Sequence, residues 1–173
     1  MPPLRAITIV TLVLALSSRP AAAQAGTTLH MVITGGPRPG TYDQSTTTAC
    51  RVALPDSGTF MVEFGNAPGA INGVSTSPDS TKIYHVALRG PDAAEARTGT
   101  GRFTLSVQMG IPVPPADPMQ AARPWRLIPV PGWSELTIHD MGGVVATEFS
   151  GVTRDSISFT GEIKCDALKR APM

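Results

Sequence analysis

Apolar and polar side chains alternate with a period of two along most of this chain. In Ile157–Cys165 the apolar side chains of Ile157, Phe159, Ile163 and Cys165 alternate with polar ones. Further segments with strand-like patterns are Thr28–Thr34, Thr41–Gln44, Thr48–Leu54, Thr59–Phe64, Lys82–Leu88, Arg102–Met109, Ser134–His139 and Val144–Phe149. A strand that packs only one face on a core requires such alternation, so the pattern predicts an all-β protein.

The segments are short, and Gly, Pro, Asp and Asn residues separate them. Turns are expected at Pro55–Gly58, Asp140–Gly143 and Gly151–Asp155. This organisation favours an antiparallel β-sandwich of roughly seven to nine strands. The two most regular segments predict a shared set of inward-facing side chains: Phe103, Leu105, Val107, Ile157, Phe159 and Ile163.

One segment has the pattern of a helix. Residues 91–97 begin with Pro91 and Asp92 and contain three alanines. Proline at the start and acidic residues in the first turn favour a helix, so one or two turns are expected near 91–97.

Residues 111–131 contain seven prolines in 21 positions. Proline cannot donate a hydrogen bond to a neighbouring strand, which excludes a central strand. We therefore expect a long, exposed and partly mobile loop over 111–131 that carries the main interaction surface. Trp125 lies within it and Trp133 just beyond it; both are candidate binding residues, and Trp125 is the expected anchor. The alternative is that Trp125 folds back over one end of the sandwich.

The N-terminal 25 residues predict export. A basic residue, Arg5, precedes the uncharged segment Ala6–Leu16, and small residues follow Pro20. This order is typical of a secretory signal peptide, and the apolar segment is too short to cross a bilayer. Cleavage after Ala23 or Ala25 fits, with Ala25 preferred. The protein is therefore expected in the periplasm or outside the cell.

Removing residues 1–25 leaves 148 residues, enough for a single domain over 26–173. The remainder carries 12 basic and 13 acidic residues, a net charge of −1, with no basic run. Nucleic acid is therefore an unexpected partner. No second apolar stretch approaches the length of a membrane span, so no transmembrane segment is expected after cleavage.

Two cysteines, Cys50 and Cys165, are the only ones in the chain. In an oxidising compartment two cysteines most simply pair with each other, so a disulfide is predicted. No histidine lies within a few residues of either, which disfavours a metal site there.

Catalytic and metal-binding patterns are weak. His85 and His139 lie in strand candidates, Asp140 follows His139, and no Gly-x-Ser-x-Gly sequence occurs. His30, His85 and His139 are widely separated, so no metal site and no cofactor are expected. Among the strand carboxylates, the pattern predicts exposed positions for Glu135, Glu148 and Glu162, whereas it leaves Glu63 open.

Three segments of the chain are similar to segments of other proteins: Ile33–Tyr42 (ITGGPRPGTY), Gly90–Gly110 (GPDAAEARTGTGRFTLSVQMG) and a final hairpin ending in GEIKC. On these segments the chain resembles a loose group of small secreted bacterial proteins whose function is not established. The resemblance implies an immunoglobulin-like β-sandwich, and residues 111–131 look like an insertion relative to it. It implies no activity.

These observations favour a non-catalytic extracytoplasmic protein that binds a partner, or forms part of an envelope assembly. The partner would be a protein or another envelope component. Two alternatives remain open: a small secreted hydrolase with a site assembled from loops, and a carrier of apolar ligands. A buried His–carboxylate pair at the floor of a cleft would favour the hydrolase.

Overall fold

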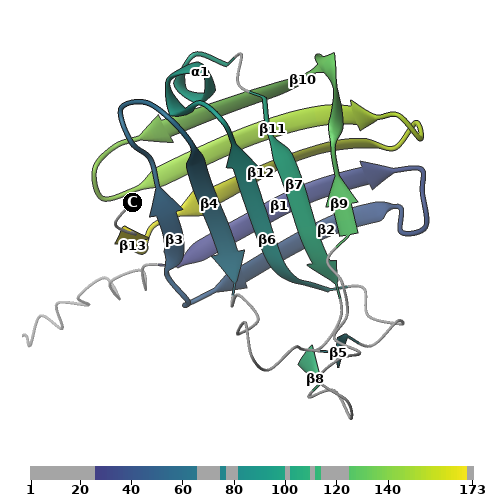
Figure 1. Cartoon of the computed structure of the whole chain (residues 1–173). Helices are drawn as coiled ribbons and strands as arrows, with labels where there is room; N and C mark the ends of the chain where they lie inside the picture. The colour runs from purple at the N-terminus through teal and green to yellow at the C-terminus, as the bar shows by residue number, and fades with distance from the viewer. Residues whose placement is uncertain are drawn as a thin grey trace, which may run out of the picture.

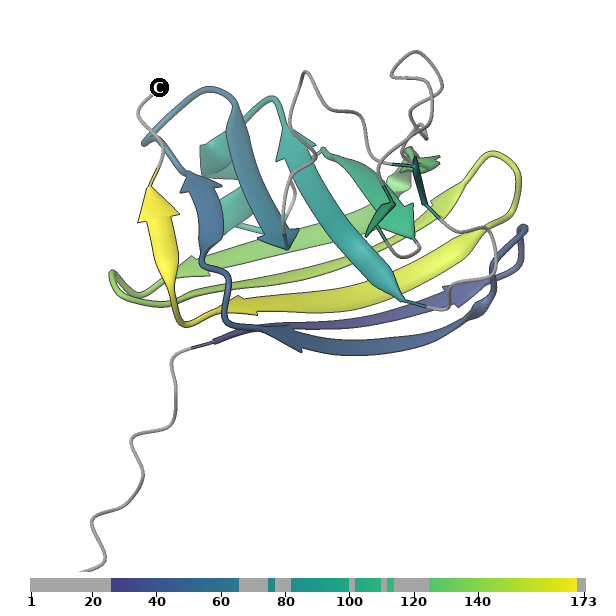
Figure 2. The same ribbon diagram turned by 90° about the horizontal axis from the view of Figure 1, so that it is seen from below.

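The computed structural model describes residues 26–65, 75–76, 82–99, 102–109, 112–113 and 125–170. Two β-sheets pack face to face, and the strands of one sheet run across those of the other (Figures 1 and 2). The all-β sandwich predicted from the alternation is confirmed. The expected signal peptide, residues 1–25, lies outside the described residues.

The two sheets contain five and six strands. The first sheet has the order β10 (Pro129–Asp140), β11 (Val145–Thr153), β12 (Ser158–Cys165), β1 (Thr27–Thr34), β2 (Gly40–Thr46). The second has the order β13 (Leu168–Arg170), β3 (Cys50–Ala53), β4 (Phe60–Gly65), β6 (Ile83–Gly90), β7 (Thr104–Met109), β9 (Trp125–Leu127). Only the β13–β3 pair is parallel among the described ladders.

A separate two-stranded ladder joins β5 (Ser75–Thr76) to β8 (Pro112–Val113). The total exceeds the expected seven to nine strands because the structure adds very short strands. Two of these, β9 and β13, have three residues each and close opposite edges of the second sheet. Such short strands carry too few alternating positions to be recognised in a sequence.

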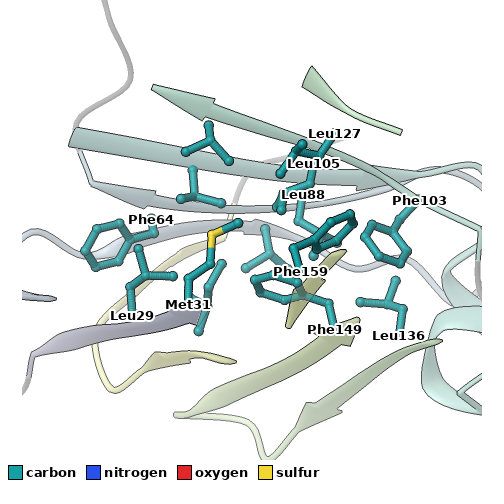
Figure 3. Packing of buried hydrophobic residues seen from close by; sticks show 14 of the residues in the cluster. Leu29, Met31, Phe64, Leu88, Phe103, Leu105, Leu127, Leu136, Phe149 and Phe159 are labelled. Atoms are coloured by element: carbon teal, nitrogen blue, oxygen red, sulfur yellow. The ribbon is translucent and has the colours of Figure 1, made fainter. Parts of the chain in front are cut away.

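The core lies between the two sheets (Figure 3). All six side chains predicted to face inward are buried, so the alternation located the core correctly. At its centre the ring of Phe103 from the second sheet meets Phe149 and Phe159 from the first, edge to face, with centroids 6.4 and 6.2 Å apart. This geometry is the favoured one for aromatic pairs.

The predicted disulfide between Cys50 and Cys165 is present. Cys50 lies on β3 and Cys165 ends β12, so the bond joins the two sheets, with the Cα atoms 5.7 Å apart. Both residues are fully buried. The covalent link therefore fixes one end of the sandwich, where the chain passes from the first sheet to β13.

The predicted helix is α1 (Ala93–Arg97), which lies beside β10. Asp92 is its N-cap and accepts hydrogen bonds from the amides of Ala94 and Glu95. An N-cap carboxylate satisfies amides that have no partner in the first turn. Ala93 and Ala96 are buried, so the small side chains allow this short helix to sit closely against the end of the sandwich.

The turns expected from the sequence lie where they were predicted. Gly142 has a φ of 81° in the turn between β10 and β11, a conformation that glycine adopts without strain. Arg170 donates to both carboxylate oxygens of Asp140 and to the carbonyl of Gly142, which attaches β13 to this turn. The predicted turn of Gly151–Asp155 is shorter than expected because β11 continues to Thr153.

The long loop predicted over 111–131 is wrong at both ends, because Pro112–Val113 form β8 and its C-terminal part forms two further strands. Residues Trp125–Leu127 form β9, and β10 begins at Pro129. Both strands lie at sheet edges, where one side of the backbone needs no partner, and this is the place where proline is tolerated in a sheet. The prolines of 114–124 lie outside the described residues.

Candidate functional site

A groove of about 600 Å³ opens where the edge strands β9 and β10 meet. We call it the edge groove. Its lining consists of Arg102, Phe103, Trp125, Arg126, Leu127, Ile128, Pro129, Val130, Pro131, Ser134, Thr153, Arg154, Asp155 and Ile157. The volume falls within the range of about 300–1,000 Å³ that is usual for small-molecule sites.

The edge groove exists because the chain passes from one sheet to the other through a single residue. Ile128 alone separates β9, an edge of the second sheet, from β10, an edge of the first. In β9, Trp125 is paired with Val107 and Leu127 with Leu105, which places both side chains on the core-facing side. The opening therefore leads toward the apolar interior.

Trp125 contributes to the core and to the groove at once. It is partly buried and packs against the core cluster. This packing agrees with the alternative that Trp125 folds back over the sandwich, although part of its side chain remains accessible. Ile128 beside it is 58 % exposed, an unusual state for a large aliphatic side chain in a concave surface. An apolar wall that remains open to water favours a ligand, because contact with one would remove apolar area from water.

The rim of the edge groove is mainly cationic. Arg102 precedes β7, Arg126 lies in β9, and Arg154 lies beside Asp155 in the turn between β11 and β12. Three arginines and one aspartate therefore line the groove together with its apolar residues. A ligand with an apolar body and a polar or anionic end would match both surfaces.

Trp133, the second predicted binding residue, lies on β10 and is 68 % exposed. It is absent from the described lining of the edge groove, so the structure does not bring Trp125 and Trp133 together in one site. A binding role for either tryptophan stays a prediction.

A second concentration of polar groups lies on the outer face of the second sheet. Glu63 is only 3 % exposed, and its carboxylate accepts hydrogen bonds from Arg89 at 2.8 Å and from Arg51 at 3.3 Å. Register explains the arrangement: Glu63 on β4 pairs with Arg51 on β3 and with Ala87 on β6, two residues before Arg89. The charge of a buried carboxylate is thereby balanced on both sides.

His85 lies near Glu63 on the same sheet face and is 7 % exposed. Its Nε2 atom has no hydrogen-bond partner among the described residues. Burial lowers the pKa of His85 below 6.5, and the Glu63 carboxylate only partly opposes that effect. His85 is therefore neutral at pH 7, which differs from the hydrogen-bonded or surface histidine that its strand position suggested.

His30 is hydrogen-bonded to a carboxylate, with its Nδ1 atom 2.5 Å from Asp43 Oδ1, and both side chains are exposed. No described hydrogen bond joins a serine or cysteine to a histidine, so the described part of the chain assembles no recognisable triad. The Glu63 carboxylate lies near His85, yet its oxygens accept hydrogen bonds from two arginines, and none of the described hydrogen bonds joins it to His85. His139 is exposed, and its neighbour Asp140 is bound by Arg170, which lowers the pKa of Asp140. A catalytic histidine needs a carboxylate that orients its ring.

The remaining carboxylates follow the sequence pattern. Glu135, Glu148 and Glu162 are exposed, as predicted. Within the described ranges, no three His, Cys, Asp or Glu side chains converge in a way that could hold a metal ion.

Sequence reasoning missed the cluster of Arg51, Glu63 and Arg89. These residues are far apart in the chain, and only the register of three strands brings them together. One signal was available: Glu63 stands between Val62 and Phe64 in an otherwise apolar strand, and a carboxylate in such a position needs a partner.

Comparison with known proteins returned no matching family model, no similar curated protein and no similar solved structure. The resemblance to small secreted bacterial proteins therefore stays a prediction. Among the described residues, no helix has the length and apolar character that a membrane crossing would require.

Proposed function

We propose that this protein is an exported, non-catalytic binding module whose ligand occupies the edge groove. The observation that carries the proposal is the apolar wall of Trp125 and Ile128, left open to water at the junction of the two sheets. Export is supported by the charged, apolar and small-residue order of residues 1–25, and the disulfide is compatible with it. The site of action would be the periplasm or the extracellular space.

The chemistry of the groove defines the class of ligand. Phe103, Trp125 and Ile157 supply an apolar wall, while Arg126 and Arg154 stand at the rim. An amphiphilic ligand, such as an acyl chain or an aromatic peptide segment with a polar end, would bury its apolar part against Trp125. Aromatic side chains provide large contact areas for few restricted torsions, which makes Trp125 the expected anchor.

The test uses Nile red, a neutral apolar dye, with the chain after removal of residues 1–25. Wild type should bind it saturably, and Ile128→Ser should weaken binding about tenfold because the groove loses its exposed aliphatic wall. Met141→Ser is the matched control, since Met141 is 65 % exposed in a turn outside the groove. Both variants alter exposed residues, so thermal melting should show that both remain folded.

Trp125→Ala, which also removes packing against the core, should reduce Nile red binding further and lower the melting temperature. Trp133→Ala should leave Nile red binding in the edge groove and the melting temperature unchanged, because Trp133 does not line that groove. Absence of saturable binding, or equal losses for Ile128→Ser and Met141→Ser, would contradict the proposal.

The alternative of a small hydrolase is favoured by the buried His85, whose Nε2 atom has no partner among the described residues and which lies near Glu63. It requires Glu63 to orient His85, whereas the Glu63 oxygens are engaged by Arg51 and Arg89. Hydrolysis of a broad ester or glycoside panel that is lost in His85→Gln would favour this alternative over the binding module.

A further inference from the structure

We propose a second ligand site: an oxyanion site on the outer face of the second sheet, formed by Arg51, Arg89 and Arg102, of which Arg102 also lines the edge groove. These arginines line an open groove of about 820 Å³, which we call the arginine groove. Thr59, Met61 and Thr104 contribute to its walls. It lies where β6 ends and where β4 and β7 begin (Figure 1).

Two of the three arginines, Arg51 and Arg89, are oriented by hydrogen bonds to the buried Glu63. The buried carboxylate of Glu63 accepts one hydrogen bond from Arg51 and one from Arg89, while these side chains remain 53 % and 63 % exposed. Each guanidinium has five N–H donors, so donors remain for a ligand. A buried carboxylate that orients two exposed guanidinium groups side by side lowers the ordering cost of binding an anion.

The third arginine is placed by the backbone. Arg89 pairs with Thr104 across β6 and β7, and Arg102 lies two residues before Thr104 on the same face. A Cβ atom at Gly90 would overlap the carbonyl oxygen of Arg102 and the ring of Phe60, so glycine allows the chain at Arg102 to approach β6 closely. Arg102 is exposed and forms no ion pair with any residue that the structure describes.

The local charge is positive in a chain that is nearly neutral. Three guanidinium groups and one carboxylate meet at the arginine groove, and neutral His85 adds no charge at pH 7. Lys169 and Arg126 extend the positive surface across the same sheet face.

The opposite face of the sandwich is acidic. The exposed charged residues on the outer face of the first sheet are Asp43, Glu135, Glu148, Glu162 and Lys164. The register even places Glu148 directly opposite Glu162. Because one face is positive and the other negative, the electric field of the protein favours the approach of an anionic ligand to the second sheet.

The ligand class follows from the donors and the size of the groove. Guanidinium groups match the oxygens of phosphate and sulfate groups. The arginine groove is several times larger than one such group, so we expect phosphate or sulfate groups carried on a larger body. Spaced oxyanions could contact Arg102 and the Arg51–Arg89 pair together.

The test is calorimetric titration at low ionic strength with tripolyphosphate in one arm and sucrose octasulfate in the other. Wild type should bind at least one of them saturably, and the arm that binds identifies phosphate or sulfate. Arg102→Gln should weaken that binding by about tenfold, the loss expected for one charge-assisted contact. Arg89→Lys keeps the charge but removes the planar fork, and it should weaken binding as well.

Lys169→Gln is the matched control, because it removes one positive charge from the same sheet face and Lys169 lines neither groove. It should change affinity by less than about twofold. Ile128→Ser should leave the affinity unchanged, which separates this site from the edge groove. No saturable binding in either arm, or equal weakening by Arg102→Gln and Lys169→Gln, would overturn the proposal.

Discussion

At the scale of single residues, His85 is a titratable group in an environment very different from water. Its ring is buried, its Nε2 atom has no partner among the described residues, and burial lowers its pKa below 6.5. A histidine in this state is neutral when the protein is folded and protonates readily when the chain unfolds. The folded state is therefore sensitive to mild acid at this position.

The direction of the pH dependence follows from proton binding. Between the lowered pKa of folded His85 and 6.5, the unfolded chain binds more protons, so the free energy of unfolding falls as the pH drops below 6.5. Above 6.5 this group contributes no pH dependence. His85→Gln should lessen the loss of melting temperature between pH 7.5 and pH 5 in thermal unfolding, both values lying about one unit or more from 6.5.

His139→Gln provides the control, since His139 is exposed on β10. It should retain the acid sensitivity of wild type. An unchanged acid response in His85→Gln would show that the protonation of His85 does not limit stability.

At the scale of elements, the alternating apolar and polar side chains of β12 point alternately into the core and into solvent. Phe159 is 1 % exposed and its neighbour Thr160 faces solvent. The large rings sit above glycines on the adjacent strand: Phe159 pairs with Gly151, and Phe149 pairs with Gly161. A Cβ atom at Gly161 would lie 2.6 Å from the ring of Phe149, so glycine leaves room for the aromatic cluster.

This arrangement predicts opposite results for two neighbouring substitutions in β12. Phe159→Ala should lower the free energy of unfolding by about 3–5 kcal/mol, because it leaves a cavity between the sheets. Thr160→Ala should lower it by less than about 0.5 kcal/mol. Chemical denaturation measures both values, and small, equal effects would be inconsistent with this register.

At the scale of the whole molecule, the disulfide is a covalent cross-link between the two sheets. Cys50 and Cys165 are separated by 115 positions, so the bond closes most of the described chain into one loop. A cross-link that closes so long a loop strongly lowers the conformational entropy of the unfolded chain, and this stabilises the folded state. The bond also lies beside the parallel pairing of β13 with β3.

Replacing both cysteines by alanine should lower the free energy of unfolding by about 2–5 kcal/mol, measured by chemical denaturation under non-reducing conditions. Alanine avoids placing new hydroxyl groups in this buried site. Reductant should destabilise wild type and leave the double variant unchanged. A double variant as stable as oxidised wild type would show that the bond contributes little.

The sequence by itself determined the fold class, the main strands, the short helix, the inward-facing side chains and the disulfide. Each of these depends on local chemistry: the period-two alternation of β12, the capping residue Asp92, or the presence of only two cysteines. The proline content of 111–131 misled because proline excludes a central strand and not an edge strand, and only the sheet order shows which strands are edges.

Both candidate sites were decided by tertiary structure alone. The edge groove needs β9 and β10 to be the edges of two different sheets, joined by Ile128. The arginine groove combines Arg51, Arg89 and Arg102 from separate strands above the buried Glu63, although the chain after residue 25 has a net charge of only −1. Alternation shows which face a side chain occupies, whereas cross-strand register and sheet order determine which distant side chains share that face.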